Sequence, residues 1–260
     1  ADRTTDYCTL KADQNSWLWE FINHWSEGIH RGVTKRSTMC EAYGLTFYGI
    51  QKYLRMEGHL DWVPKERRGG AIVELARAIK AALDQTLVNS NNGKAWLKEV
   101  SDTAISLNQH LSWVTPSGCN VVHYYTKTQT RRSVAKLFNN RELRFFVKTD
   151  DPDPRAARQA ISPNFIHSLD AAHMFLTIDR MMGYNIEDYC MIHDSYGCHP
   201  NFVPTMRDLI REEFLLMHRY NCLEKFKTGV ERSFGTNLPD LPSTGVFDLE
   251  TVTSSEYFFA

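Results

Sequence analysis

Apolar residues recur at intervals of three and four positions along most of this chain, the spacing that places them on one face of an α-helix. The spacing predicts helical stretches over residues 16–30, 34–56, 71–87, 94–107, 164–182 and 204–233. We expect Gly69-Gly70 to break the chain before the third stretch and Asn91-Asn92-Gly93 to end it, because glycine and asparagine favour turns over helix interiors.

The pattern changes in the middle of the chain, where polar and β-branched residues alternate as they do in strands. Strand pairs are predicted over residues 112–127, 131–148 and 189–198, with turns at Pro116-Ser117-Gly118 and Asn139-Asn140 in the first two. Residues 151–154 form a stiff acidic break, and the tail from Pro239 is expected to be extended. These elements predict a mainly α fold with a small antiparallel β element, an α+β class.

Composition places the chain among ordinary globular proteins, with 42% hydrophobic and 23% charged residues and a net charge of −1. No apolar run approaches the ~20 residues that span a bilayer, and the first residues lack a signal or transit pattern, so no membrane partner is expected. The cysteines are scattered without CxxC pairs, which favours reduced and mostly buried thiols over zinc or disulfides. They are Cys8, Cys40, Cys119, Cys190, Cys198 and Cys222.

One predicted helix carries a basic and aromatic row at successive steps of four: Arg31, Lys35, Met39 and Tyr43. Residues at this spacing wind along one helix face, and the row extends for about 18 Å at roughly 1.5 Å per residue. Lysine and arginine suit a triphosphate, and tyrosine offers a flat ring to a sugar or base. Gly44 would let a backbone or a base approach closely. A solvated basic helix with Tyr43 in the core is the alternative.

The string from Thr34 to Met39, followed by Ala42-Tyr43-Gly44, resembles motif B of phage-type single-subunit RNA polymerases, which family A DNA polymerases share in part. The resemblance implies that Lys35 contacts the triphosphate and can protonate the leaving pyrophosphate. It also implies that Arg31 meets phosphate, and that Tyr43 helps to select the sugar and monitors the base pair.

A second candidate site is the turn between two predicted strands, where His193-Asp194-Ser195 follows the apolar run 189–192. A charged pair at the tip of a buried hairpin is costly unless a cation compensates it, and aspartate is a hard oxygen ligand that suits Mg²⁺. The alternative is an aspartate that caps its own turn. The tripeptide resembles motif C of the same RNA polymerases, which implies that Asp194 holds two Mg²⁺ ions and His193 lies near the RNA 3′ end.

Further segments resemble the same family in the same order along the chain. Residues 163–173 resemble a palm helix in which His167 touches the minor groove of the newest base pair. Residues 113–118 resemble the strand and turn before a promoter-reading hairpin, here about 122–149, and the C-terminal residues Phe258, Phe259 and Ala260 resemble a foot that folds back towards the active site. Basic residues in the hairpin are candidate DNA contacts: Lys127, Arg131, Arg132, Arg141 and Arg144. A solvated charged hairpin is the alternative.

The resemblance divides the chain into expected regions: an N-terminal helical segment of unknown role (1–30), a fingers-like region (31–110), a palm-like region (111–200) and C-terminal helices with the foot (201–260). The family's motif A, which carries the other catalytic aspartate, has no match here, and Asp248 in an apolar run is the best internal substitute. We therefore expect one subunit of a split polymerase, inactive until a second chain supplies motif A, the thumb and the N-terminal regions. A cleaved or recombinant fragment is the lesser possibility.

The resemblance implies ribonucleoside triphosphates, RNA and a DNA template as partners, with a DNA-opening helper protein as a further candidate. It favours a phage enzyme in the cytoplasm of an infected host cell over a mitochondrial one. A family A DNA polymerase fragment and a non-catalytic DNA-binding subunit descended from a polymerase stay open as alternatives. So does a metallohydrolase built on His167, Asp170 and His173, which share about 120° of one helix face.

Overall fold

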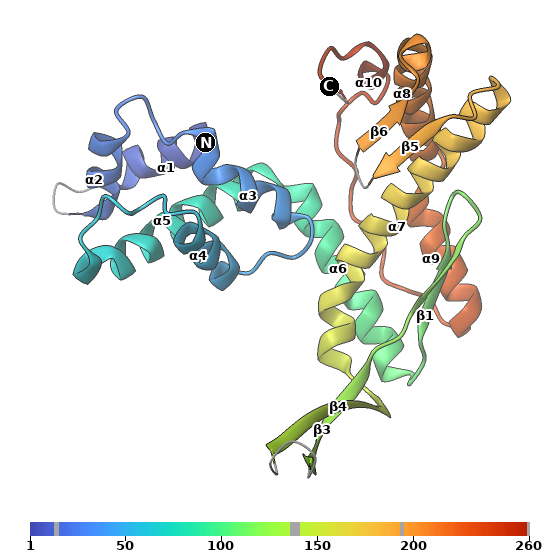
Figure 1. The fold of residues 1–260 in the computed structure, drawn as a ribbon, viewed down its shortest axis with the longest axis horizontal. Coiled ribbons are helices and arrows are strands. Elements are labelled where there is room, and N and C mark those ends of the chain that lie inside the picture. The colour runs from blue at the N-terminus through green and yellow to red at the C-terminus, as the bar shows by residue number, and fades with distance from the viewer. Residues whose placement is uncertain (13–15, 136–140, 193–194, 259–260) are drawn as a thin grey trace. The chain divides into compact units, whose positions relative to one another are not determined.

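The computed structural model describes residues 1–12, 16–135, 141–192 and 195–258 (Figure 1). The chain divides into two compact units, one made of residues 1–96 with 242–244 and the other of 97–241 with 245–260. The boundary after Trp96 falls inside a helix. Within the described residues the fold is mainly helical with three two-stranded antiparallel sheets, as the sequence predicts. None of the described helices is long and apolar enough to cross a bilayer.

The first unit is built around one long helix. Its elements are α1 (Asp2–Lys11), α2 (Trp17–His24), α3 (Arg31–Glu41), α4 (Phe47–Met56), α5 (Lys65–Thr86) and the first part of α6 (Val88–Ser106). Helix α5 buries apolar side chains such as Ile72, Leu75 and Ile79 and contacts α1, α2, α3 and α4. The N-terminal segment therefore shares a core with the region that carries the basic and aromatic row, with Phe21 and Val33 in the same cluster.

Three sequence predictions in this unit are wrong. The stretch 34–56 is two helices, because Gly44 adopts a left-handed conformation (φ +82°) that ends α3. Gly69-Gly70 lies inside α5, where a Cβ on Gly70 would meet the Trp17 Nε1 atom at 3.2 Å, so the small residue admits the indole. Residues 91–93 lie inside α6, because the chain turns earlier, between Thr86 and Val88.

The second unit contains the remainder of α6, the strands and the C-terminal helices. Its strands are β1 (Leu111–Val114), β2 (Asn120–His123), β3 (Thr126–Ala135), β4 (Arg141–Pro152), β5 (Tyr189–Ile192) and β6 (Ser195–Cys198). Its helices are α7 (Pro154–Gly183), a short 3₁₀ turn (Pro200–Phe202), α8 (Val203–Arg219), α9 (Cys222–Phe234) and α10 (Thr251–Ser254). Helix α7 packs against α8 and β2, and α9 packs against β1.

Two helix boundaries in this unit differ from the predictions. Helix α7 begins at Pro154, where the Asp153 carboxylate accepts the Ala156 N–H at 3.0 Å, and it continues through Pro163 instead of starting after it. Burial of Ile161 and Phe165 on both sides of that proline offsets its missing N–H donor. The stretch 204–233 is two helices, because Asn221 turns the chain with φ +51°.

The strand pairs follow the predicted hairpins. Leu111 pairs with His123, Ala135 with Arg141, and Ile192 with Ser195, so each sheet is one hairpin. The turn predicted at Asn139-Asn140 lies outside the described residues. All six cysteines are free, but only Cys8 is buried, and Cys119 and Cys190 are exposed. The prediction of mostly buried thiols is therefore wrong.

Candidate nucleotide-binding helix and catalytic hairpin

Helix α3 and the turn after it have one exposed face and one buried face. The exposed row contains the four predicted positions, Arg31, Lys35, Met39 and Tyr43. The buried positions that face the core are Val33, Thr34, Ser37 and Glu41. Tyr43 is 40% exposed, which contradicts the alternative that this ring lies in the core. The described hydrogen bonds and ion pairs do not use the side chains of Arg31 or Lys35, so the cationic end of the row faces solvent.

The turn that presents Tyr43 is a Schellman motif. The Leu45 N–H donates to the Cys40 carbonyl (3.2 Å) and the Gly44 N–H donates to the Glu41 carbonyl (3.0 Å), with Gly44 at φ +82°. A Cβ on Gly44 would meet no described atom within 4 Å. The glycine is therefore required by its backbone conformation, and the sequence-based idea that it permits a close approach has no support within the described chain.

A side-chain network fixes the flank of α3 next to α4. The Arg36 guanidinium lies 4.3 Å from the centre of the Tyr53 ring and donates to Glu57 at 3.0 Å. Cys40 donates its thiol to the Tyr53 hydroxyl at 3.8 Å. Arg36 is thus held within its own unit, in contrast to its neighbour Lys35.

The β5–β6 hairpin brackets the predicted metal ligand. Ile192 pairs with Ser195, and the connecting residues His193 and Asp194 lie outside the described residues. The hairpin is less buried than the sequence argument assumed, since Ile192 is 62% exposed. Among the described residues of the hairpin, Met191, Tyr196 and Cys198 pack on an apolar cluster that includes Met181 of α7 and Leu209 of α8.

A magnesium ion beside this hairpin would need several oxygen ligands from the surrounding side chains. Carboxylates are the ligand type that Mg²⁺ prefers. However, the described residues contain no group of three or more His, Cys, Asp or Glu side chains placed to hold a metal. Asp248 accepts the Glu250 N–H at 3.0 Å in the turn that precedes α10, and it does not lie in a strand. The donor set within the described part of the chain is therefore incomplete for two metal ions.

Helix α7 presents His167 outward while its opposite face is buried. Trp113 of β1 donates from its indole N–H to the Ser168 hydroxyl at 3.0 Å, and its ring packs against Phe165 and Phe226. These contacts set the rotation of α7 and leave His167 exposed. His173 lies in the core with its Nε2 atom 2.8 Å from the Ile210 carbonyl, so the metal site imagined on His167, Asp170 and His173 does not form in the described structure.

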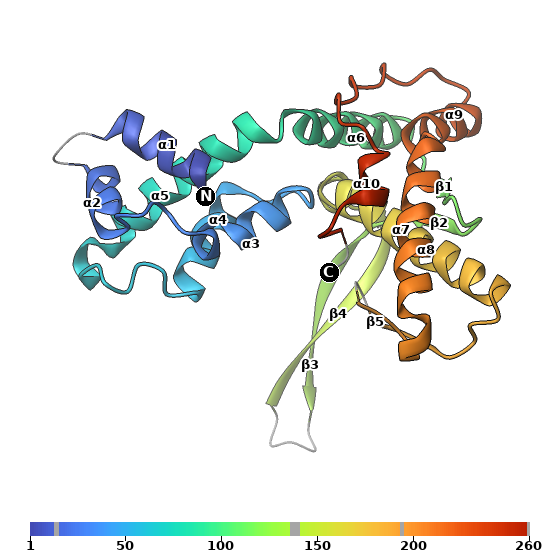
Figure 2. The ribbon, with the colours of Figure 1, turned by 90° about the horizontal axis from the view of Figure 1, so that it is seen from above.

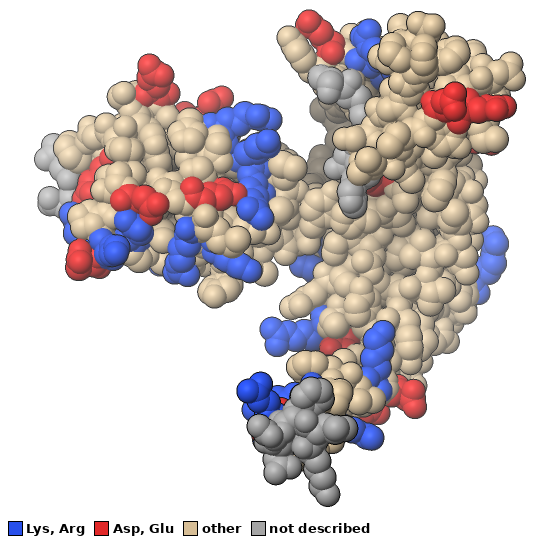
Figure 3. Space-filling model, in the orientation of Figure 1, with Lys and Arg blue, Asp and Glu red and all other residues tan. Residues whose placement is uncertain are grey.

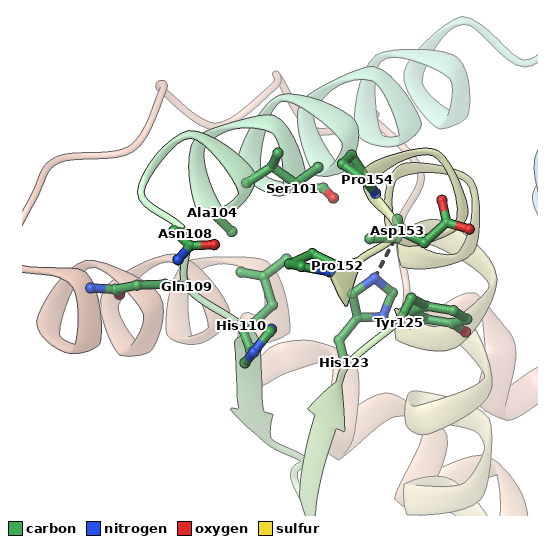
Figure 4. Close-up of a pocket in the computed structure, with 13 residues that line it drawn as sticks. Ser101, Ala104, Asn108, Gln109, His110, His123, Tyr125, Pro152, Asp153 and Pro154 are labelled. Atoms are coloured by element: carbon green, nitrogen blue, oxygen red, sulfur yellow. Dashed lines mark hydrogen bonds between the residues drawn. The ribbon is translucent and has the colours of Figure 1, made fainter. Parts of the chain in front are cut away.

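A pocket between α6, β2 and the start of α7 contains a buried histidine (Figure 4). His123 donates from Nε2 to the Ala157 carbonyl (2.9 Å), and its Nδ1 accepts from the Asn164 amide (3.1 Å), which also donates to the Tyr125 hydroxyl (2.9 Å). This pattern requires the neutral ring. Burial lowers the pKa of His123, although the bond to Ala157 opposes the change. The residues that line the pocket include none of the predicted site residues. The hydrogen bonds of His123 connect the β1–β2 hairpin to α7.

We expect the second unit to lose stability as the pH falls below about 6.5, the ordinary histidine pKa. Burial lowers the pKa of both His123 and His173 in the folded state, so the unfolded chain binds protons first. The contribution of these two histidines to the free energy of unfolding is complete above the pKa that they have in the unfolded chain. It is lost as the pH falls through the lower pKa values that they have in the folded protein. Urea midpoints at pH 7.5 and 5.5 measure the loss. His123→Gln should reduce the difference, whereas His110→Gln, at an exposed position, should leave it unchanged; equal pH dependence in all three proteins would contradict the assignment.

The C-terminal tail folds back onto α8, beside the β5–β6 hairpin. Arg211, which is 2% exposed, donates to the Thr253 carbonyl (3.2 Å) and to the Phe258 carbonyl (3.0 Å). The Phe258 ring lies 4.8 Å from Phe214 and joins the apolar cluster that includes Met191. The last two residues of the predicted foot, Phe259 and Ala260, lie outside the described residues. A lone arginine within the apolar stripe of α8 is the sequence signal that could have revealed this anchor.

The β3–β4 ribbon extends away from the helices of its unit (Figure 2), and the register of its strands gives it two faces that differ in composition. Basic side chains gather over it on the face shown in Figure 3. The pairing of Arg131 with Phe145 puts one set of side chains on the first face: Gln129, Arg131, Ser133, Arg141, Leu143, Phe145 and Val147. The second face contains Thr130, Arg132, Val134, Glu142, Arg144 and Phe146. Glu142 lies 3.2 Å from Arg132 and 3.9 Å from Arg144, while the described ion pairs do not involve Arg131 or Arg141.

Each unit therefore holds part of the predicted machinery. The first unit presents Arg31, Lys35 and Tyr43 on one helix. The second unit holds the strands that flank Asp194, the exposed His167, the basic ribbon and the tail with Phe258. An exposed basic and aromatic row on a helix, and a hairpin that flanks His193-Asp194, are the features by which the sequence resembles a template-directed nucleotide polymerase.

Comparison with known proteins agrees with that class. A family model described as DNA-dependent RNA polymerase matches residues 6–238 and so begins inside α1, N-terminal to Arg31. DNA-directed RNA polymerase 2, chloroplastic/mitochondrial, of Arabidopsis thaliana is 30% identical over 234 residues, covering 89% of this chain and 23% of that protein. DNA-directed RNA polymerase 2A of Nicotiana tabacum is 31% identical over 238 residues, covering 89% of this chain and 69% of that protein.

A mouse relative, DNA-directed RNA polymerase, mitochondrial, is 29% identical over 259 residues and shows the same partial coverage, 89% of this chain and 21% of its own length. The chain belongs to the family of phage-type DNA-dependent RNA polymerases. It spans less than a quarter of the length of the Arabidopsis and mouse relatives.

Proposed function

We propose that this chain is the C-terminal catalytic part of a DNA-dependent RNA polymerase, which binds the incoming ribonucleoside triphosphate on α3 and contributes Asp194 to a two-magnesium site. The observation that carries the proposal is the division of α3, whose exposed face displays Arg31, Lys35 and Tyr43 while its other face is fixed in the core. The first turn of α3 contains Arg31 and no acidic residue. Because a helix N-terminus favours anions, this end suits the phosphates.

Asp194 is the candidate ligand for magnesium, and a further carboxylate, outside these 260 residues, is proposed to complete the donor set. Bound magnesium ions would stabilise the charge that develops on the transferred phosphoryl group. The exposed apolar residues of the second unit are consistent with a covering partner. Tyr189 and Ile192 of β5 are 37% and 62% exposed beside the proposed metal ligand, so this strand offers apolar surface to such a partner.

Extension of a pre-formed RNA–DNA scaffold with Mg²⁺ and ribonucleotides tests this function. We expect the chain alone to be folded by circular dichroism but inactive, and a mixture with the polypeptide that carries motif A to extend the RNA. Extension by the chain alone that is abolished by Asp194→Asn would show that these residues contain a second ligand. Extension by the mixture that survives Asp194→Asn would favour a non-catalytic DNA-binding subunit. A preference for deoxyribonucleotides would favour a DNA polymerase.

We also propose that the β3–β4 ribbon contacts DNA through the face that contains Arg131 and Arg141. This face combines cations outside the described ion pairs with an apolar row, Leu143, Phe145 and Val147. On the other face Glu142 lies near Arg132 and Arg144 and partly neutralises them. Groove contacts use both charge and apolar surface, so the first face is the better match.

Arg131→Ala is expected to weaken DNA binding by the complete polymerase and to reduce the slope of log K against log salt by about 1, the value for one phosphate contact. Arg132→Ala is the matched control and should change the slope by less than half as much, because Glu142 already compensates that cation. Binding isotherms between low and physiological salt measure both slopes. A larger change for Arg132 would assign the DNA to the opposite face.

A further inference from the structure

A buried ion cluster lies directly beneath the turn that presents Tyr43. Glu41, at the end of α3, is 1% exposed. Its Oε1 atom accepts from Lys94 of α6 at 2.6 Å and from Lys80 of α5 at 3.3 Å. Lys80 also donates to Asp84 at 2.6 Å. The cluster therefore joins the end of α3 to two other helices of the same unit. Glu41 and Lys94 are largely withdrawn from water, whereas Lys80 and Asp84 lie at its partly exposed edge.

Lys94 also binds the backbone of the turn itself. Its ammonium group donates to the Glu41 carbonyl at 2.8 Å, and this same carbonyl accepts the Gly44 N–H at 3.0 Å in the Schellman motif. The left-handed Gly44 and the preceding Tyr43 are thus fixed by a contact from α6. Helix C-termini carry partial negative charge, so a lysine placed there is favourable as well as directional.

The cluster is poorly explained as a source of stability. A buried carboxylate pays a desolvation cost that an apolar residue of similar volume would not, and replacing buried ion pairs by apolar residues is often neutral or stabilising. The Glu41 Oε2 atom has no hydrogen-bond partner among the described residues. Hydrogen bonds are directional whereas apolar packing is not. Such a cluster therefore fixes the position of the groups that it joins more effectively than it stabilises the folded state.

We propose that Glu41, with Lys80 and Lys94, is a positioning residue that holds Tyr43 and the exposed face of α3 in register for the sugar of the incoming ribonucleotide. The inference rests on the proposed function of α3. Glu41 reaches no substrate; it acts through the turn, two residues before Tyr43. Displacement of a positioned group by about 1 Å can cost up to roughly 100-fold in rate, and the largest effect should fall on the choice between ribose and deoxyribose, which the resemblance assigns to Tyr43.

Glu41→Leu in the complete polymerase tests the proposal, because it keeps the packing and removes the directional contacts. We expect a lowered Tm, because Lys94 and Lys80 lose their shared carboxylate partner. We also expect a KM for ribonucleotides raised several-fold, and a ratio of kcat/KM for ribonucleotides over deoxyribonucleotides lowered roughly tenfold in the enzyme that folds. The ratio is independent of the fraction of active enzyme, so a merely structural defect would not change it. Glu74→Leu, which removes the exposed pair with Arg77 on α5, is the matched control and should leave the ratio unchanged.

Lys94→Met provides a second test if Glu41→Leu does not fold, since it removes the bond to the turn and leaves Glu41 paired with Lys80. It should lower the same ratio in the same direction. Ratios within twofold of wild type in a folded Glu41→Leu or Lys94→Met enzyme would overturn the positioning role, provided that Lys35→Met is inactive. If Lys35→Met stays active, the proposed function of α3 itself fails, and the two failures are thereby distinguished.

Discussion

Asp194→Asn is expected to lower RNA extension by the complete polymerase at least about 100-fold, with folding and DNA binding unchanged. Groups that merely orient a metal ligand contribute roughly 10- to 100-fold, so the loss of the ligand itself should be no smaller. Asparagine keeps the size of the side chain but removes the negative charge that two Mg²⁺ ions require. Single-turnover extension of a scaffold at saturating nucleotide, over a magnesium titration, measures the loss of rate.

Asp248→Asn is the matched control, because that carboxylate accepts the Glu250 N–H in the turn before α10 and lies outside the proposed site. Its rate should stay within about twofold of wild type, since the amide oxygen of asparagine can accept the same backbone hydrogen bond. Partial recovery of Asp194→Asn at high magnesium would agree with a weakened metal site. Full activity of Asp194→Asn at ordinary magnesium would remove this residue from the mechanism.

Lys35→Met should reduce kcat/KM for ribonucleotides by about 100-fold or more in the complete polymerase. The side chain lies on the exposed face of α3, and the resemblance assigns it both a triphosphate contact and protonation of the pyrophosphate. General acid catalysis alone contributes roughly 10² to 10⁴ in rate, and methionine keeps the length of the side chain while removing its proton. Because a group that acts on the leaving pyrophosphate affects the transition state, the loss should appear mainly in kcat.

Lys52→Met on α4 is the control for this substitution, since Lys52 is also an exposed lysine of the first unit. It should leave both constants unchanged. A loss confined to KM in Lys35→Met would mean that the lysine contributes binding only. Equal effects of the two variants would indicate a general charge effect instead of a site on α3.

The family, the helical class and the chemically active strings could be predicted from the sequence because each depends on short-range patterns. The row of Arg31, Lys35, Met39 and Tyr43 follows from helical periodicity, and its exposure is confirmed. The hairpins follow from strand alternation and turn residues, and all three are present. The roles of Lys35, His167 and Asp194 remain predictions that the experiments above address.

Where the sequence predictions failed, long-range packing outweighed local preference. Gly69-Gly70 is helical because α5 is the core of its unit and Gly70 admits Trp17, and Pro163 lies within α7 because its neighbours are buried. Propensity differences of about 1 kcal/mol for glycine and 3 kcal/mol for proline are smaller than the burial of several apolar side chains. Local rules therefore misplace boundaries that the core decides.

By itself the sequence determined which chemistry this chain offers: a cationic and aromatic helix face, a His-Asp turn and a basic ribbon, since residue type and spacing set each of them. Only the tertiary structure decided how those groups are held. Glu41 meets Lys94 across 53 positions of sequence, and Arg211 meets the Phe258 carbonyl across 47. A charged residue in an apolar stripe shows that a partner is needed, but only the folded chain supplies the partner, because charges that remain buried must be paired in space.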